Sequence, residues 1–150
     1  MSEPIFQLAV RGRHYMKFIC LGYMAPGRFE SLSDDQRNAI VDQCFEYDDK
    51  LRAKGHFASG EGLEGPEATR TLSLKNRKVV VSDGPYAETK EHAAGLLVLE
   101  ARDIQEAVQL MSQHPGLQMG PWEIRPVADL NEMIRQSELR RRRKPAAAGN

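Results

Sequence analysis

Side chains that could do chemistry gather in one stretch near the middle of the chain, residues 83–91, which reads DGPYAETKE. After a turn signal this stretch supplies a phenol, two carboxylates and an ammonium, from Tyr86, Glu88, Glu91 and Lys90. Pairs between exposed charges contribute only about 0–1 kcal/mol to stability, so stability alone explains these residue types poorly. A cleft that removed water from one carboxylate beside Lys90 would instead make that carboxylate a base near neutral pH.

The start of this stretch, Asp83-Gly84-Pro85, admits two interpretations. It suits a turn, because Asp bonds to nearby backbone, Gly tolerates a positive φ and Pro fixes the next residue. Alternatively, Asp83 ends a strand and faces a cleft, where it would be a catalytic base. Tyr86 likewise either donates a hydrogen bond to a ligand oxygen or packs as an aromatic side chain with its hydroxyl at the surface.

Three residues outside this stretch are further candidates. His114 follows a predicted helix, where it either caps the C-terminus or acts as a catalytic acid or base, since histidines titrate near neutral pH. Arg125 lies on a predicted strand, and its planar fork would suit a carboxylate ligand if it points inward rather than to solvent. Glu61 stands between two glycines and is a similar candidate for ligand binding.

Metal and cofactor motifs were sought and not found. His14, His56 and His92 do not have the spacing of metal ligands. The Gly60-Glu61-Gly62 sequence lacks both the spacing of a phosphate loop and the helix that would follow it. We therefore expect neither a metal nor a cofactor.

The composition fits one globular domain, with 150 residues, of which 41% are hydrophobic and 28% charged. Because the formal net charge is zero, we do not expect nucleic acid as a partner, and the basic run 140–144 is interpreted as a solvated tail. Cys20 and Cys44 are interpreted as small buried hydrophobes rather than a disulfide. The sequence has neither a signal peptide nor a run of about 20 apolar residues, so we expect a cytoplasmic protein without membrane contact.

Secondary structure can be assigned along most of the chain. Helices are predicted after Ser33, Asp103 and Asp129, each followed three residues later by Gln or Glu in a capping pattern. Alternating or continuous apolar residues predict strands, and Asn76-Arg77 predicts the turn of a β-hairpin. The predicted strands are residues 17–24, 56–63, 95–100 and 122–127, with the hairpin at 69–74 and 78–82.

This order of elements predicts an α+β fold: a ferredoxin-like βαββαβ sandwich with an extra hairpin strand and a C-terminal helix. Residues 1–15 are expected to be an N-terminal extension, 16–128 the domain, and 129–150 a C-terminal helix with a basic tail. Two helices on one face would leave the other face of the sheet bare. Because a second copy of the sheet commonly closes such a face, a homodimer is expected.

Several segments together resemble the DGPF family of YCII-related proteins, over about residues 16–127. The most specific is DGPYAETKE at 83–91, which in the family usually reads DGPFAETKE, so that Tyr86 replaces a Phe. The other segments are Met16-Lys17 before an apolar strand, Gly60-Glu61-Gly62-Leu63, Gly95, His114-Pro115 and Glu123-Ile124-Arg125-Pro126-Val127.

The resemblance implies a ferredoxin-like fold that pairs into a dimeric α/β barrel, in a superfamily that includes small cofactor-independent enzymes. YCII proteins have been proposed to use a His–Asp pair in a cleft, with the His on the first helix. Here the first predicted helix carries no histidine and offers Asp42, Asp48 and Asp49 instead. Genes for DGPF-type proteins often neighbour those for sigma factors, and the family has no assigned activity.

Two functions are therefore compared. The first is a small-ligand-binding or sigma-factor-associated accessory protein, in which 83–91 shapes a pocket or a dimer interface. The alternative is a cofactor-independent enzyme that performs acid–base chemistry on a small organic acid or carbonyl compound. In that enzyme Asp83 and His114 would be catalytic, and Arg125 would anchor the substrate. The ligand-binding candidates are Glu61, Tyr86, Glu88, Lys90, Glu91 and Arg125.

Overall fold

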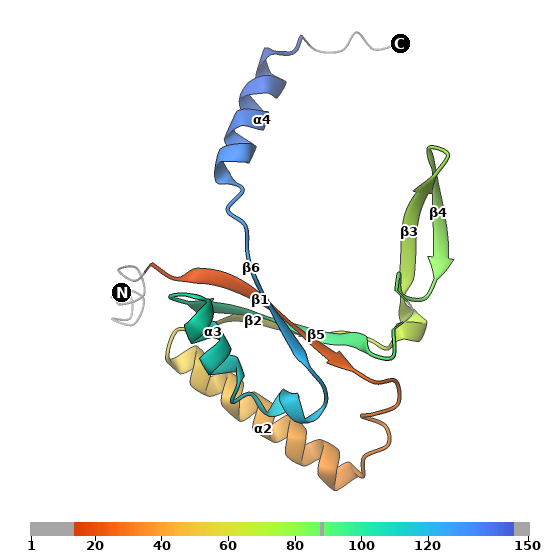
Figure 1. The fold of residues 1–150 in the computed structure, drawn as a ribbon, viewed down its shortest axis with the longest axis vertical. Helices are drawn as coiled ribbons and strands as arrows, with labels where there is room; N and C mark the ends of the chain where they lie inside the picture. The colour runs from red at the N-terminus through yellow and green to blue at the C-terminus, as the bar shows by residue number, and fades with distance from the viewer. Residues whose placement is uncertain (1–13, 88, 146–150) are drawn as a thin grey trace, which may run out of the picture.

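A four-stranded antiparallel sheet lies at the centre of the chain, seen in a computed structural model that describes residues 14–87 and 89–145 (Figure 1). The strand order is β2-β5-β1-β6. Expectations for residues 1–13 and for Glu88 lie outside the described residues. The strands of this sheet are β1 (Met16–Met24), β2 (Phe57–Gly62), β5 (His92–Ala101) and β6 (Trp122–Pro126).

Two helices cover one face of the sheet, α2 (Asp34–Ala53) and α3 (Ile104–Met111) (Figure 1). A short 3₁₀ turn, η2 (Pro115–Gln118), follows α3 and leads into β6. With β1, β2, β5 and β6 these helices give the βαββαβ order and the strand arrangement of a ferredoxin-like α+β fold, so the predicted fold class is confirmed.

The sequence predicted that the hairpin would add one strand to the βαββαβ sheet, and the structure differs on this point. Both strands of the hairpin, β3 (Arg70–Lys75) and β4 (Lys78–Asp83), pair only with each other and form a separate two-stranded sheet. Its turn is the predicted one, because Asn76 and Arg77 adopt φ values of 50° and 64°, as a tight hairpin turn requires. The irregular segment before it, which contains the 3₁₀ turn η1 (Pro66–Ala68), separates the hairpin from β2.

The helix starts agree with two of the three capping patterns. Ser33 and Gln36 form a reciprocal capping box on α2, and Asp103 accepts the N–H of Glu106 at the start of α3. The third prediction was wrong in detail: α4 (Asn131–Arg143) has Leu130 at its N-cap, without a side-chain cap. Asp129 instead accepts the N–H of Asn131, two residues on, at 2.9 Å, which forms a turn before the helix.

The core lies between the sheet and the two helices. Alternate residues of β1 and β5 point into it, and Phe18, Cys20 and Leu99 are completely buried there. The intervening residues, including the pairs Ile19 with Val98 and Leu21 with Leu96, lie on the other face. No helix of the described residues covers that second face (Figure 1).

Both cysteines are free, as expected, and Cys20 belongs to the core. Within the described part of the chain, no helix has the length and apolar character that crossing a membrane would require.

Candidate functional site

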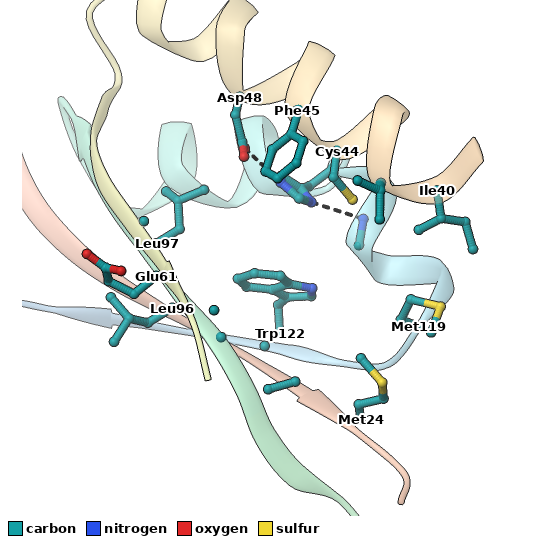
Figure 2. A pocket seen from close by; sticks show the side chains of 18 of the residues that line it. Met24, Ile40, Cys44, Phe45, Asp48, Glu61, Leu96, Leu97, Met119 and Trp122 are labelled. Carbon is teal, nitrogen blue, oxygen red and sulfur yellow. Dashed lines mark hydrogen bonds and ion pairs between the residues drawn. The ribbon is translucent and has the colours of Figure 1, made fainter. Parts of the chain in front are cut away.

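A pocket of about 620 Å³ opens between α2, the helix-facing side of the sheet and the turn after α3 (Figure 2). Its wall is mainly apolar and aromatic, which is typical of sites for small molecules. The aromatic rings come from Tyr23, Phe29, Phe45, Phe57 and Trp122, and most of the apolar remainder from Met24, Ile40, Val41, Leu97 and Met119.

The floor of the pocket exists because three neighbouring strands carry glycine at the same level. Gly95 of β5 pairs with Gly22 of β1 on one side and Gly62 of β2 on the other. The Trp122 ring packs over Gly22 so closely that an added Cβ would lie 2.7 Å from it, whereas a Cβ at Gly62 would meet nothing within 4 Å. The missing side chains therefore leave a recess beside the indole that larger residues would fill.

Asp48, Asp49 and Glu61 are the carboxylates among the lining residues, and Asp48 is the one held by a histidine. Asp48 of α2 accepts a hydrogen bond at 3.0 Å from Nε2 of His114, which lies between α3 and η2 (Figure 2). The His114 side chain is 4% exposed and that of Asp48 is 17% exposed. The imidazole is thus enclosed, with Tyr47 edge-on at 5.5 Å and Trp122 tilted at 5.3 Å between ring centroids, while Asp48 keeps an open side toward the pocket.

The hydrogen bonds of His114 fix its tautomer. Nδ1 accepts the backbone N–H of Gly116 at 3.0 Å, so this nitrogen carries no proton and Nε2 carries the one donated to Asp48. Residue 116 must be glycine for this contact, because a Cβ there would lie 2.9 Å from Nδ1. Since both ring nitrogens are occupied by the protein, the imidazole orients Asp48 rather than meeting a ligand itself.

Three further polar groups at or near the pocket are paired or held neutral. Arg52 bonds to Asp49 at 2.6 Å and stacks over the Phe57 ring at 4.3 Å. Burial raises the pKa of the Cys44 thiol, and the nearby charge of Asp48 raises it further, so the thiol stays protonated and is a poor nucleophile. Burial also raises the pKa of Tyr47, whose hydroxyl donates to the carbonyl of Leu110.

Of the two candidates for catalysis, the structure places only His114 at the pocket. Asp83 does not line it: its side chain is 90% exposed and forms an ion pair at 3.2 Å with Arg70 at the base of the hairpin. Residues 83–91 follow a hairpin that projects from the sheet, which keeps Asp83 and His114 from being brought together (Figure 1).

The ligand-binding candidates are dispersed. Tyr86 is 89% exposed, Lys90 and Glu91 are exposed too, and none of the three lines the pocket. Arg125 pairs in register with Ile19 on the uncovered face, and its Nε lies 3.9 Å from Oε1 of Glu123. Glu61 lies at the edge of the pocket, but it pairs with Leu96 and so lies on the uncovered face of the sheet (Figure 2).

Sequence reasoning did not join Asp48 to His114. A signal was present in the helix, because Ile40, Cys44 and Leu51 mark the buried stripe of α2 and Asp48 falls on the same stripe. A carboxylate on an otherwise apolar helix face requires a buried partner. The identity of that partner depends on the packing of η2 against α2, more than 60 residues further along the chain.

The fold and the pocket define a small antiparallel α+β protein with a His–Asp pair at an enclosed apolar site. Residues 16–131 match the model of the YCII-related domain, and the chain belongs to that family. It is also similar to an uncharacterized protein, R00369, of Rhizobium meliloti (strain 1021), with 34% identity over 65 residues. This match covers 41% of the present chain and 51% of the relative, so the chain spans about half the length of the curated relative it matches.

Proposed function

We propose that the protein binds a small, mainly apolar molecule in the pocket and that Asp48 contacts its polar end. The observation that carries this proposal is the carboxylate of Asp48 on a mainly apolar wall, held at 3.0 Å by the enclosed His114. Placing a carboxylate in such surroundings is unfavourable unless its hydrogen bonds are satisfied. His114 satisfies one oxygen, and a donor group on a ligand would satisfy the other.

The charges around the pocket favour a neutral ligand over an organic acid. Arg52 is the cation among the residues that line the described pocket, and it is already paired with Asp49. Arg125, the expected anchor for a carboxylate, lies on the opposite face of the sheet. An anionic ligand would therefore approach Asp48 without a free cation to balance it, so alcohols and carbonyl compounds with an apolar body suit the site better.

The lone tryptophan of the sequence provides the test, because Trp122 lines the pocket floor and its fluorescence should change when a ligand enters. A set of small alcohols, ketones and aldehydes would be titrated into the purified protein. Gly62→Leu should abolish the fluorescence change and Gly62→Ala should weaken it, because residue 62 opens into free space. Equal binding by the wild type and Gly62→Leu would contradict the proposal.

A pair of carboxylate variants separates the role of Asp48 from that of charge in general. Asp48→Asn should weaken binding of an alcohol about tenfold, since a hydrogen bond to a charged acceptor contributes about 1.5–3 kcal/mol. Asp42→Asn removes the same charge from an exposed side chain of the same helix that does not line the pocket, and it should leave binding unchanged.

The hydrogen bond from His114 favours a second candidate function, acid–base catalysis with Asp48 as the base. A carboxylate oriented by a protein-held donor can remove a proton from the carbon next to a bound carbonyl group, leaving an enolate. Proton–deuterium exchange of candidate ketones in D₂O, followed by NMR, would report this step. Asp48→Asn should slow the exchange by about 10²–10⁴-fold. Binding without exchange would leave the first function and exclude the second.

Association with a sigma factor and pairing of two copies, both expected from the sequence, stay predictions at this point.

A further inference from the structure

One face of the β3–β4 hairpin is apolar and exposed to solvent, except for the Arg70–Asp83 ion pair at its base. Leu72 pairs with Val81 and Leu74 with Val79 in direct cross-strand register, so all four side chains lie on the same face. They are 61–69% exposed. The other face carries mainly polar residues, among them Thr71, Ser73 and Ser82. The hairpin is therefore amphipathic, and no other described helix or strand lies against its apolar side (Figure 1).

The signature stretch fixes the base of this hairpin. Asp83 forms an ion pair with Arg70 across the two strands, and the N–H of Gly84 donates to the carbonyl of Thr69 at 2.9 Å. The hydroxyl of Thr71 donates to the carbonyl of Gly84 at 2.7 Å, and Gly84 has the positive φ of 88° that this closure requires. These contacts close the base of the hairpin, which projects from the sheet (Figure 1).

Helix α4 lacks a partner in the same way. Its apolar residues Leu130, Met133 and Ile134 follow the three- and four-residue spacing of one helix face, and they are 49–67% exposed. None of its residues is buried. Figure 1 shows α4 and the hairpin extending from the sheet on the side away from α2 and α3, apart from each other.

We infer that the apolar face of the hairpin packs on α4 of a second copy of this chain, and that the two copies exchange these contacts. A two-stranded hairpin is marginal in water unless more strands or a helix cover its apolar face, and a helix of 13 residues is marginal without tertiary packing. When the hairpin of one copy packs on α4 of the other, both the hairpin and α4 gain a covering partner. The hairpin–α4 contact forms twice in the dimer, because a two-fold axis repeats every contact.

The area required by a stable dimer favours a second copy over an unrelated protein. Such a dimer takes about 800 Å² from each partner. The hairpin and α4 together expose on the order of several hundred Å² of apolar side chain, and the uncovered sheet face between them adds Ile19, Leu21, Leu96 and Val98. The same chain thus carries, on the side of the sheet away from α2 and α3, several apolar surfaces that could cover one another.

Engineered cysteines test the contact, in a Cys44→Ser background so that only buried Cys20 remains. The protein carrying both Val79→Cys and Met133→Cys should form a disulfide-linked dimer under mild oxidation. Ser73→Cys with Met133→Cys is the matched control, because Ser73 lies on the opposite face of the hairpin, and it should stay unlinked. A disulfide within one chain, or equal linkage in the control, would overturn the inference.

A second measurement does not depend on disulfide geometry. Leu72→Ser combined with Val81→Ser should weaken dimerisation at least tenfold in sedimentation velocity, with an unchanged far-ultraviolet circular dichroism spectrum apart from the hairpin. Ser73→Ala, on the polar face, should have little effect on association. A wild-type chain that sediments as a monomer at all accessible concentrations, or a Leu72/Val81 variant that dimerises normally, would rule out the exchange.

Discussion

At Asp48 and His114 the important question is which ring nitrogens and carboxylate oxygens remain free to bind a ligand. His114 gives Nε2–H to Asp48 and takes the N–H of Gly116 on Nδ1, so it has no nitrogen left for a ligand. Asp48 has one oxygen to spare and faces the pocket. A histidine that looks like a catalytic residue in the sequence therefore serves here to orient the carboxylate.

Removing the carboxylate should affect stability as well as binding. Asp48→Ala leaves an enclosed imidazole N–H without an acceptor, which should lower the free energy of unfolding by about 1–3 kcal/mol. Asp48→Asn keeps an acceptor and should cost less. Urea denaturation of both variants would measure this, with Asp49→Ala as the control, since an exposed substitution there should change stability by no more than about 0.5 kcal/mol.

Cys20 should make stability depend on alkaline pH. Burial raises the pKa of its thiol from 9.0 in the unfolded chain to about 11 in the fold. Because the folded state holds the proton more tightly, its contribution to stability is complete below pH 9.0 and is lost as the pH rises through about 11. Urea denaturation across this interval should show wild-type stability falling more steeply than that of Cys20→Ala. Parallel pH profiles for the two proteins would contradict this.

Among the elements, α2 carries both the core and the ligand-facing carboxylate. Its start is fixed by the Ser33–Gln36 capping box, and it contributes Leu51 to the core and Asp48 to the pocket. The glycine-bearing strands β1, β2 and β5 form the opposite wall. The pocket is thus a consequence of a capped amphipathic helix packed over a floor that lacks side chains.

Ser33→Ala should remove one half of this capping box. The loss of the bond from the N–H of Gln36 should lower the free energy of unfolding by about 1 kcal/mol, within the range of 0.5–2 kcal/mol for such caps. Ser31→Ala is a suitable control, because Ser31 is exposed and bonds only to the carbonyl of Arg28 outside the helix. Thermal denaturation of the two variants would distinguish the cap from a general effect of losing a hydroxyl.

At the scale of the whole molecule, the main feature is the face of the sheet that no described helix covers. Its centre is apolar, with Ile19, Leu21, Leu96 and Val98 in two cross-strand pairs, and polar residues such as Glu123 and Arg125 lie at one edge. An apolar centre with a polar rim is the usual pattern of a protein interface. The sheet face and the exchanged hairpin would then belong to one continuous contact between two copies.

Leu21→Lys should therefore weaken association without unfolding the chain. A charge at the centre of an interface loses its water and has no partner there, whereas on a solvated face it is harmless. Light scattering should show the variant shifting from dimer to monomer at concentrations where the wild type is paired. If the wild type itself scatters as a monomer, the predicted dimeric barrel is wrong.

Features that depend on neighbouring residues could be predicted from the sequence, whereas features that depend on distant residues could not. The strands, the caps at Ser33 and Asp103 and the turn at Asn76-Arg77 depend on neighbouring residues, so patterns of a few residues were sufficient. The cap of α4 was misplaced because Asp129 can satisfy its side chain two residues on as readily as three. The hairpin was predicted correctly, but its separation from the main sheet was not. Alternation of polar and apolar residues along a strand does not indicate which other strands it pairs with.

The sequence by itself determined the α+β frame, the family signature at 83–91 and the residue types available for chemistry, because periodicity, capping and turn preference are local. Only the tertiary structure decided which of those residues meet. It moved the candidate site away from the signature stretch, where the ion pair of Asp83 with Arg70 and the bonds of Gly84 close the base of the hairpin. It brought Asp48 and His114 together across 66 residues instead, through the packing of α2 on the turn after α3.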